Sequence, residues 1–371
     1  MPTTVFILGA GASKQAGAPL MAEFLSVARR LRQTDKVREY DEAFKTVFDA
    51  MAELQAVHSK STLDFNNVES LFSAVELAKT IGKFPNRTVQ QIDGILDALK
   101  IVIVATLEKT ILFPSLDRGS FSAPRPYSEF VSLVRELRET ARPPHRTGIL
   151  TFNYDVCVDV ALYFEGLDAH YGLDGTSGDG AAIPLLKLHG SLNWTDIQKT
   201  REIVPWLIQD YLSRHSIGPF GYKNILIPIG THLSELKAQH SDATGLPVLV
   251  APTFNKGDSH RTLSKVWETA AKLLSEAENI FVVGYSLPPG DGFFEYLYAL
   301  GTVGSTLLER LWVFNPDSTG EVNSRFQKLI GAGAKQSYRF FPLTFEQAIG
   351  VIHEEVSAWA DLGGSFSWFR G

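Results

Sequence analysis

The sequence predicts an α/β fold in which a Rossmann-like parallel sheet carries helices on both faces. Its predicted strands are short apolar runs without the alternation of a half-buried strand, as in 280–283. These runs alternate with stretches in which apolar residues recur at helical spacing. Strands of this kind, separated by helices, are typical of a parallel sheet that is buried on both faces.

The strands are expected where short apolar runs occur. They are predicted at residues 5–8, 147–152, 183–188, 248–251, 280–283 and 311–314, with further candidates at 225–229 and at an edge position, 338–341. In an open parallel sheet, ligands bind beyond the carboxyl ends of the strands. The residues that directly follow each run are therefore the first place to look for a site.

Helical spacing of apolar residues predicts eight further segments. These are 20–54, 68–75, 92–112, 127–137, 156–164, 263–277, 293–300 and 345–359. Either Asn66 or Asn67 is expected to cap the second segment. The helices before residue 145 form a stretch too long for one βαβ crossover. The chain is therefore predicted to be a single domain over 1–371, with a helical insertion at 20–145 and a smaller inserted module at 195–246.

The composition excludes several classes of protein. The chain of 371 residues has a net charge of −6, so no global basic field favours nucleic-acid binding. Its one cysteine, Cys157, excludes an internal disulfide and a multi-cysteine zinc site, and no metal is expected. No signal-peptide pattern and no apolar run of about 18 residues is present, which predicts a cytoplasmic protein without a membrane contact.

The first predicted strand ends in a glycine turn, Gly9-Ala10-Gly11-Ala12-Ser13, followed by a helical stretch. A strand that feeds glycines into the start of a helix brings backbone N–H groups close to a pyrophosphate. The third glycine of the usual fingerprint is missing, and Gly17 lies too far along the chain. A tight turn that binds no ligand therefore stays an alternative for this segment alone.

Four other predicted strands also end in polar or glycine-containing clusters. These are Asn153-Tyr154-Asp155, His189-Gly190-Ser191, Gly284-Tyr285-Ser286 and Asn315-Pro316-Asp317. Each cluster by itself could be a helix cap or a turn. Five clusters on one rim of a sheet indicate an active cleft. Cys157 is interpreted as a packing residue, and the absence of a Gly-x-Ser-x-Gly elbow argues against a serine hydrolase triad.

Taken in order, the five segments resemble the NAD-site motifs of sirtuins. They read GAGASKQAGAP at 9–19, TFNYD at 151–155, KLHGS at 187–191, VGYSL at 283–287 and VFNPD at 313–317. The sequence resembles the prokaryotic SIR2-like proteins more than the sirtuin deacetylases; the former share the sirtuin fold but cleave NAD without a deacetylation substrate. The resemblance implies a SIR2-like fold with NAD as the substrate.

The resemblance also implies individual roles. Asn153 would hold the nicotinamide ribose and a water, Asp155 the nicotinamide amide, and His189 would be the catalytic base. Breaking the nicotinamide–ribose bond builds positive charge on the sugar, so oriented polar groups near the ribose suit this chemistry. The implied NAD-binding residues are Gly9, Ala10, Gly11, Ser13 and Pro19 in the first motif, Gly284 and Ser286 in the fourth, and Asn315 and Asp317 in the fifth.

We therefore expect an NAD+ glycohydrolase that depletes NAD+ in bacterial anti-phage defence. The resemblance implies a homo-oligomer or a partner protein such as a HerA-type ATPase or a short Argonaute, with no direct nucleic-acid binding. The four zinc cysteines of sirtuin deacetylases are missing, and Met21-Ala22 replaces their Phe-Arg pair. Two alternatives stay open: a zinc-free deacylase or ADP-ribosyltransferase, and a non-enzymatic regulator that binds NAD or ADP-ribose.

Overall fold

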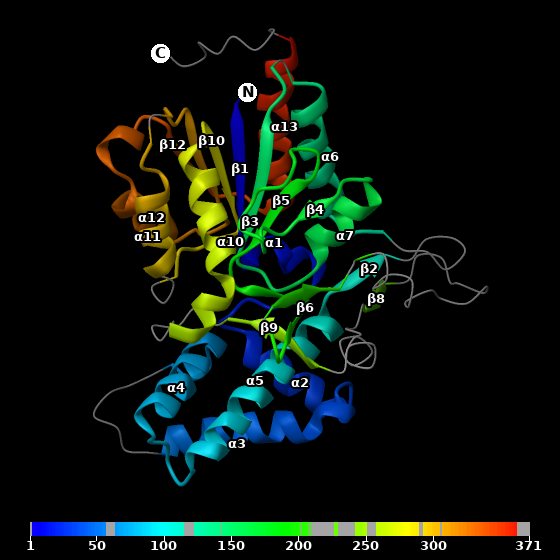
Figure 1. Ribbon diagram of the computed structural model, residues 1–371, viewed down its shortest axis with the longest axis vertical. Helices are drawn as coiled ribbons and strands as arrows, with labels where there is room; N and C mark the ends of the chain where they lie inside the picture. Colours follow the sequence, from blue (N-terminus) through cyan, green and yellow to red (C-terminus); the bar gives the residue numbers. More distant parts are fainter. Residues whose placement is uncertain are drawn as a thin grey trace, which may run out of the picture. The chain divides into compact units, whose positions relative to one another are not determined.

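A computed structural model describes residues 2–56, 64–114, 122–141, 143–200, 202–206, 208, 226–228, 242–250, 257–288, 292–304 and 306–361 (Figure 1). The chain divides into two compact units. Unit 1 comprises Met1–Ala16, Phe121–Leu188 and Leu263–Gly371, and unit 2 comprises Gly17–Ser120 and His189–Thr262.

Unit 1 is built on a seven-stranded sheet with the order β12-β11-β10-β1-β3-β5-β4, in which every neighbouring pair is parallel. Its strands are β1 (Thr3–Leu8), β3 (Arg146–Thr151), β4 (Ala169–His170), β5 (Ile183–Lys187), β10 (Asn279–Val283), β11 (Arg310–Phe314) and β12 (Tyr338–Phe341). The predicted α/β class and parallel sheet are confirmed. The strands that follow β1 in the chain lie on both sides of it, with β3 on one side and β10 on the other. The topological switch point therefore lies between β1 and β10.

Helices cover both faces of this sheet, as predicted (Figure 1). On one face Phe6 of β1 contacts Phe130 edge to face, with ring centroids 5.0 Å apart. On the other face Gly148 of β3 leaves space for Leu273, which an added Cβ would meet at 2.3 Å. The first face carries α6 (Tyr127–Glu139), α7 (Cys157–Phe164) and α13 (Phe345–Asp361); the second carries α10 (Gly257–Ser275), α11 (Gly292–Gly301) and α12 (Glu321–Leu329).

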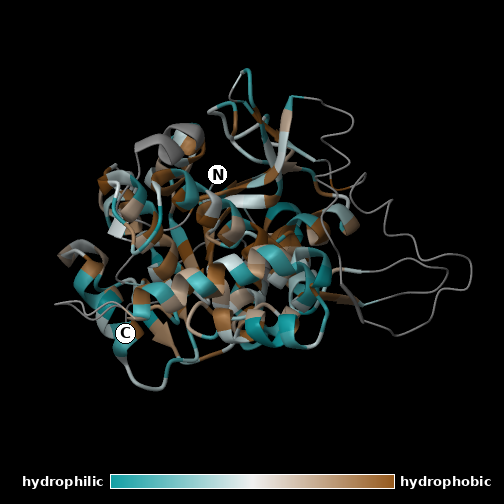
Figure 2. Cartoon of the chain, turned by 90° about the horizontal axis from the view of Figure 1, so that it is seen from below, coloured by the Kyte–Doolittle hydropathy of each residue, from teal (hydrophilic) through white to brown (hydrophobic). Residues whose placement is uncertain are grey.

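The helices of both units are amphipathic. In Figure 2 they carry hydrophilic and hydrophobic residues side by side along their length. Burial of the apolar stripe against a sheet or another helix supplies most of the stability of such helices. None of the described helices combines the length and the hydropathy that a membrane crossing needs.

In unit 2, three of the predicted helical segments form the four helices α2 (Phe24–Gln33), α3 (Asp41–Ala56), α4 (Val68–Ile81) and α5 (Val89–Thr110). The stretch 20–54, predicted as one helical segment, forms the two helices α2 and α3. Asn67 caps α4 by accepting the backbone N–H groups of Glu69 and Ser70. Thr88 caps α5 in a reciprocal capping box with Gln91.

The strands of unit 2 pair differently from the prediction. β2 (Leu112–Pro114) pairs with β8 (Leu226–Pro228), and β6 (Gly190–Ile197) lies between β7 (Ile203–Pro205) and β9 (Ala243–Leu249), all antiparallel. The run 248–251 was predicted to be a core strand, yet Val248 and Leu249 end β9 and pair with Ser191 and Gly190. An apolar run shows that a strand is buried but not which strand it pairs with. Residue 251 lies outside the described residues.

The predicted domain boundaries stay a prediction. Helix α6 falls within the sequence range 20–145 of the predicted helical insertion, but it belongs to unit 1. Much of the predicted module at 195–246, including 209–225 and 229–241, lies outside the described residues.

Candidate active site

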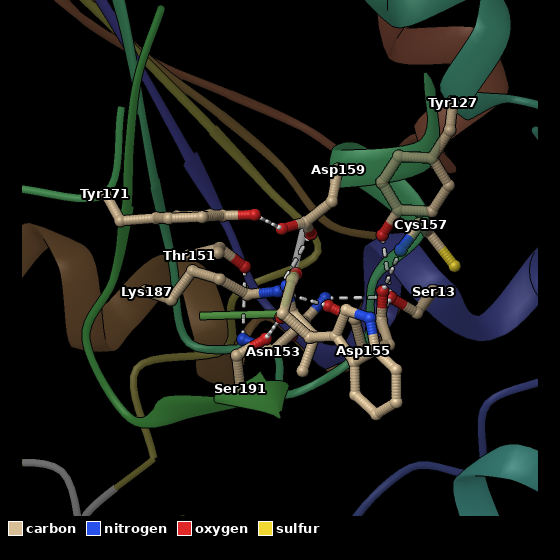
Figure 3. A network of polar contacts seen from close by, with 12 residues as sticks. Ser13, Tyr127, Thr151, Asn153, Asp155, Cys157, Asp159, Tyr171, Lys187 and Ser191 are labelled. Carbon is tan, nitrogen blue, oxygen red and sulfur yellow. Dashed lines mark hydrogen bonds and ion pairs between the residues drawn. The ribbon is translucent and has the colours of Figure 1, made fainter. Parts of the chain in front are cut away.

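A buried polar cluster lies at the carboxyl edge of the parallel sheet in unit 1 (Figure 3). It is formed by Ser13, just after β1, and by Asn153 and Asp155, just after β3. Because β1 and β3 are neighbouring parallel strands, the segments that follow them meet at the same edge. All three side chains are buried.

Ser13 is the centre of this cluster. Its Oγ donates a hydrogen bond to Asp155 Oδ2 at 2.6 Å, and it accepts one from Asn153 Nδ2 at 2.8 Å. The hydroxyl of Tyr127 lies 2.6 Å from the same oxygen. A serine hydroxyl has one hydrogen and two lone pairs, so Tyr127 must be the donor in this third contact.

Asn153 is held through its amide nitrogen. Nδ2 donates both of its hydrogens within the protein, one to Ser13 Oγ and one to the Gly9 carbonyl oxygen at 2.9 Å. Within the described part of the chain, Asn153 Oδ1 has no hydrogen-bond partner. This oxygen is therefore the polar atom of Asn153 that can bind a ligand.

Asp155 is held at three atoms. Its Oδ2 accepts from Ser13 Oγ, and its Oδ1 accepts from the backbone N–H of Cys157 at 3.0 Å. Its carbonyl oxygen accepts from Lys187 Nζ at 2.6 Å. Each carboxylate oxygen keeps lone-pair capacity for a further hydrogen-bond donor.

Burial raises the pKa of two groups around this cluster. The pKa of the Tyr127 hydroxyl is raised well above its ordinary value by burial and then by the nearby Asp155 carboxylate, which keeps it a hydrogen-bond donor. Burial and the same carboxylate raise the pKa of the Cys157 thiol. Because a thiol that stays protonated is a poor nucleophile, the interpretation of Cys157 as a packing residue is consistent with its surroundings.

The predicted glycines are required by packing between two turns. A Cβ on Gly9 would lie 2.5 Å from Tyr285 Cα, and one on Gly11 would lie 2.8 Å from the Gly284 carbonyl oxygen. Gly284 has φ +65°, and its Cβ would lie 2.3 Å from Ala12 N. The N–H groups of Gly9 and Gly11 donate to the carbonyls of Val283 and Gly284. These two turns follow β1 and β10, so they meet at the topological switch point.

The remaining predicted residues of unit 1 lie beyond the same edge of the sheet. Ala10 begins the short helix α1 (Ala10–Ser13), and Ser286 follows β10, where its carbonyl oxygen accepts from Arg325 Nη1. Asn315 follows β11. The Asp317 carboxylate accepts from the Thr319 hydroxyl and from the backbone N–H groups of Val322 and Thr319, which lowers its pKa and organises the turn before α12.

Two predicted residues belong to unit 2 and are described within it. Pro19 is buried in the segment before α2. His189 follows β5 by two positions, and its carbonyl oxygen accepts from Val250 N at 2.9 Å. The next residue, Gly190, has φ +89°, and its Cβ would meet the Val248 carbonyl oxygen at 1.9 Å, so only glycine fits there.

Sequence reasoning missed three polar residues in and beside the cluster. Tyr127 and Tyr171 have no motif around them, and nothing in the sequence relates them to the strand ends. Asp159 could have been found, because a carboxylate in the apolar stretch Cys157–Phe164 needs a buried partner. Its partner is Lys187, which lies in the motif KLHGS at 187–191. Among the described residues, no group of His, Cys, Asp and Glu side chains could hold a metal ion.

The fold and this cluster define a Rossmann-like α/β protein with a buried polar site at the carboxyl edge of its sheet. No protein-family model matches the chain, and no curated protein matches it. The chain is similar to a solved SIR2 homologue–NAD complex, with 13% identity and a TM-score of 0.43, over 96% of this chain and 90% of that chain. It is also similar to a Sir2 homologue mutant bound to ADP-ribose, with 12% identity and a TM-score of 0.43, over 97% of this chain and 94% of that chain.

A third similarity is to Sir2 with a p53 peptide and NAD+, with 11% identity and a TM-score of 0.38, over 96% of this chain and 93% of that chain. At such identities and TM-scores these similarities carry no argument.

Proposed function

We propose that the protein is an NAD+ glycohydrolase that cleaves the nicotinamide–ribose bond and releases nicotinamide and ADP-ribose. The observation that carries this proposal is Asn153, whose amide is fixed by two hydrogen bonds while Oδ1 stays available to a ligand. It lies at the carboxyl edge of a parallel sheet, where α/β folds bind their ligands. The five sirtuin-like motifs favour NAD+ as that ligand.

Asn153 suits the charge that develops during this reaction. When the C–N bond breaks, nicotinamide leaves as a neutral molecule with the bonding electron pair, and positive charge builds on the ribose. A carbonyl oxygen is the negative end of a dipole, and one held in place stabilises that charge without reorganisation. The same oxygen can accept a hydrogen bond from a ribose hydroxyl or from the attacking water.

His189 is proposed as the base that completes the hydrolysis. The oxygen of a water forms a bond to the anomeric carbon, and a proton of that water passes to the imidazole directly or through a ribose hydroxyl. Histidine side chains in general accept protons close to neutral pH. The motif Lys187–Ser191 supports this role.

The remaining motif residues are proposed to hold the rest of NAD+. Gly9, Ala10, Gly11, Ser13 and Pro19 would bind near the pyrophosphate, Gly284 and Ser286 near a phosphate or the adenosine ribose, and Asn315 and Asp317 at the adenosine ribose. Asp155 would accept from the nicotinamide amide. No metal is needed for this reaction scheme.

The biological role rests on the resemblance alone. It is that of a cytoplasmic effector which depletes NAD+ during anti-phage defence and is controlled by self-assembly or by a partner such as a HerA-type ATPase or a short Argonaute. Such a partner would be encoded beside this chain, so its addition belongs in the assay below.

The test measures nicotinamide release from NAD+ by the purified protein, with and without the neighbouring gene product. Asn153→Ala and His189→Ala should each lower turnover by roughly 100-fold. The matched controls are Asn66→Ala and His353→Ala, which change exposed residues away from the motifs and should leave turnover unchanged. Full turnover in His189→Ala would overturn its assignment as the base.

Two other results would favour the alternative functions. NAD+ that binds but stays intact under every condition would favour a non-enzymatic regulator. Nicotinamide release that depends on an added acylated peptide or protein acceptor would favour a zinc-free deacylase or an ADP-ribosyltransferase.

A further inference from the structure

Unit 1 contains a lysine that is buried at the end of a core strand. Lys187 is the last residue of β5, and its side chain is 1% exposed. Its ion-pair partner, Asp159 of α7, is 0% exposed. A buried ion pair is costly to desolvate and seldom stabilises a fold more than apolar residues of similar volume do. Its presence beside the candidate site therefore points to a role other than bulk stability.

Lys187 joins the two ends of the segment that carries Asn153 and Asp155, through its backbone at one end and its ammonium group at the other. At one end, Lys187 is paired with Thr151, and the next N–H, of Leu188, donates to the Thr151 carbonyl oxygen. At the other end, Nζ lies 2.8 Å from Asp159 Oδ2 on α7. Between these anchors, Nζ donates to the Asp155 carbonyl oxygen at 2.6 Å, a charge-assisted hydrogen bond.

The second oxygen of Asp159 is also fixed. Tyr171 donates its hydroxyl hydrogen to Asp159 Oδ1 at 2.7 Å (Figure 3). The carboxylate thus cannot rotate away from the ammonium group without breaking a second hydrogen bond. Lys187, Asp159 and Tyr171 together form what we term the buried clamp.

The clamp acts on the site through Asp155. With its carbonyl oxygen held by Lys187, Asp155 presents one carboxylate oxygen to Cys157 N and the other to Ser13 Oγ. Ser13 in turn accepts from Asn153 Nδ2 and so helps to fix the Asn153 amide. Loss of the clamp would release the backbone of Asp155 and, through Ser13, the orientation of Asn153.

We propose that Lys187 is a positioning residue which, through the buried clamp, holds the Asn153–Asp155 turn in its reactive geometry. The effect on turnover rests on the proposed NAD+ cleavage, whereas the effect on the turn does not. In this role the clamp acts through Asp155 and Ser13, without a part in proton transfer.

The test replaces the whole clamp with apolar residues, in the variant Lys187→Met/Asp159→Leu/Tyr171→Phe, so that no buried charge is left without its partner. Hydrogen exchange of the Cys157 amide reports the turn, because this N–H donates to Asp155 Oδ1. We expect its exchange to become roughly tenfold faster while slow amides of β1 and β11 are unchanged. Turnover should fall roughly tenfold in kcat with KM changed by less than about threefold.

A matched control removes a partly buried ion pair of unit 1 at the opposite, amino-terminal edge of the sheet. Arg310 begins β11 and lies 3.1 Å from Glu355. Arg310→Met/Glu355→Leu should leave the exchange of Cys157 and the kcat unchanged. A purely structural role for the clamp would make the two variants alike, with stability as the only quantity that changes.

The outcomes separate the two proposals. Unchanged Cys157 exchange in a folded clamp variant would overturn the positioning role. A wild-type protein that binds NAD+ without cleaving it would overturn the glycohydrolase proposal, and the exchange experiment would still decide the role of the clamp. If the triple variant does not fold, Tyr171→Phe alone keeps the ion pair, and it should accelerate Cys157 exchange by roughly threefold. No acceleration there would count against the clamp.

Discussion

At the scale of single residues, the candidate site is a set of side chains that fix one another. Ser13 uses its hydrogen and both lone pairs on Asp155, Asn153 and Tyr127. Side chains that share several buried hydrogen bonds hold one another in place, and removal of one partner leaves a buried polar group unpaired. Two predictions follow from individual residues of unit 1.

Tyr127→Phe should lower the free energy of unfolding by about 1 kcal/mol, because Ser13 Oγ loses a buried hydrogen bond. Urea denaturation at pH 7 measures this change. Tyr163→Phe, which removes an exposed hydroxyl, is the control and should have no effect. An equal effect of both substitutions would contradict the network.

His145 should make stability depend on pH below neutrality. Burial, followed by the charge of Arg310, lowers its pKa to about 4 in the folded protein. Since the folded pKa lies below the unfolded value of about 6.5, stability is complete above that value and is lost as pH falls from about 6.5 toward 4. Between pH 7 and 5, His145 alone should remove roughly 2 kcal/mol.

Urea denaturation of the wild type and of His145→Gln at several pH values checks this prediction. The variant should show a flatter dependence of unfolding free energy on pH over this window. The same slope in both proteins would mean that His145 is not the group responsible.

At the scale of elements, caps stabilise the predicted helices, and glycines allow the turns after the predicted strands to pack closely. Asn67 and Thr88 satisfy the first N–H groups of α4 and α5. Gly9, Gly11 and Gly284 allow the turns after β1 and β10 to touch backbone to backbone. We therefore expect substitutions of a cap residue and of a turn glycine to lower stability by different amounts.

Asn67→Ala should lower the free energy of unfolding by about 1 kcal/mol, because the N–H groups of Glu69 and Ser70 lose their acceptor. Asn66→Ala is a matched control one residue earlier, at an exposed position, and should change stability by less than about 0.5 kcal/mol. Urea denaturation distinguishes them. The reverse order would place the cap of α4 at Asn66.

Gly284→Ala should destabilise the protein by more than about 2 kcal/mol, because the added Cβ meets Ala12 N at 2.3 Å in addition to the strain of a positive φ. Gly320→Ala has a similar φ of +80° but nothing within 4 Å, so it should cost only about 1 kcal/mol. Thermal unfolding of the two variants gives the comparison. Equal losses would show that close approach of the two turns adds nothing.

At the scale of the whole molecule, the sequence predicts local structure and the edge of the sheet that carries the site. The runs Val5–Leu8, 280–283 and 311–314 are β1, β10 and β11, because strands buried on both faces need continuous apolar residues. The prediction for the run 248–251 was wrong in its pairing, because Val248 and Leu249 pair with β6, which begins at Gly190 inside the motif. Pairing between distant segments is not encoded in the apolar pattern of one run.

The sequence likewise predicts part of the candidate site, namely the residues that directly follow strands. Ser13, Asn153 and Asp155 follow strands of a parallel sheet, and that position alone brings them together. Tyr127 lies 114 positions after Ser13 in the sequence, and no local sequence pattern predicts a contact between them. The role of Lys187 depends on which carbonyl oxygen its ammonium group reaches, which only the folded chain shows.

The most direct measurement of the central claim is the stoichiometry of products formed from NAD+ alone. The purified protein, with its neighbouring gene product and without any acylated peptide, is incubated with NAD+, and nicotinamide and ADP-ribose are quantified together. Hydrolysis predicts equal amounts of the two products and the loss of both in Asn153→Ala. Nicotinamide without matching ADP-ribose, or NAD+ that remains intact in the complete assembly, would contradict the account.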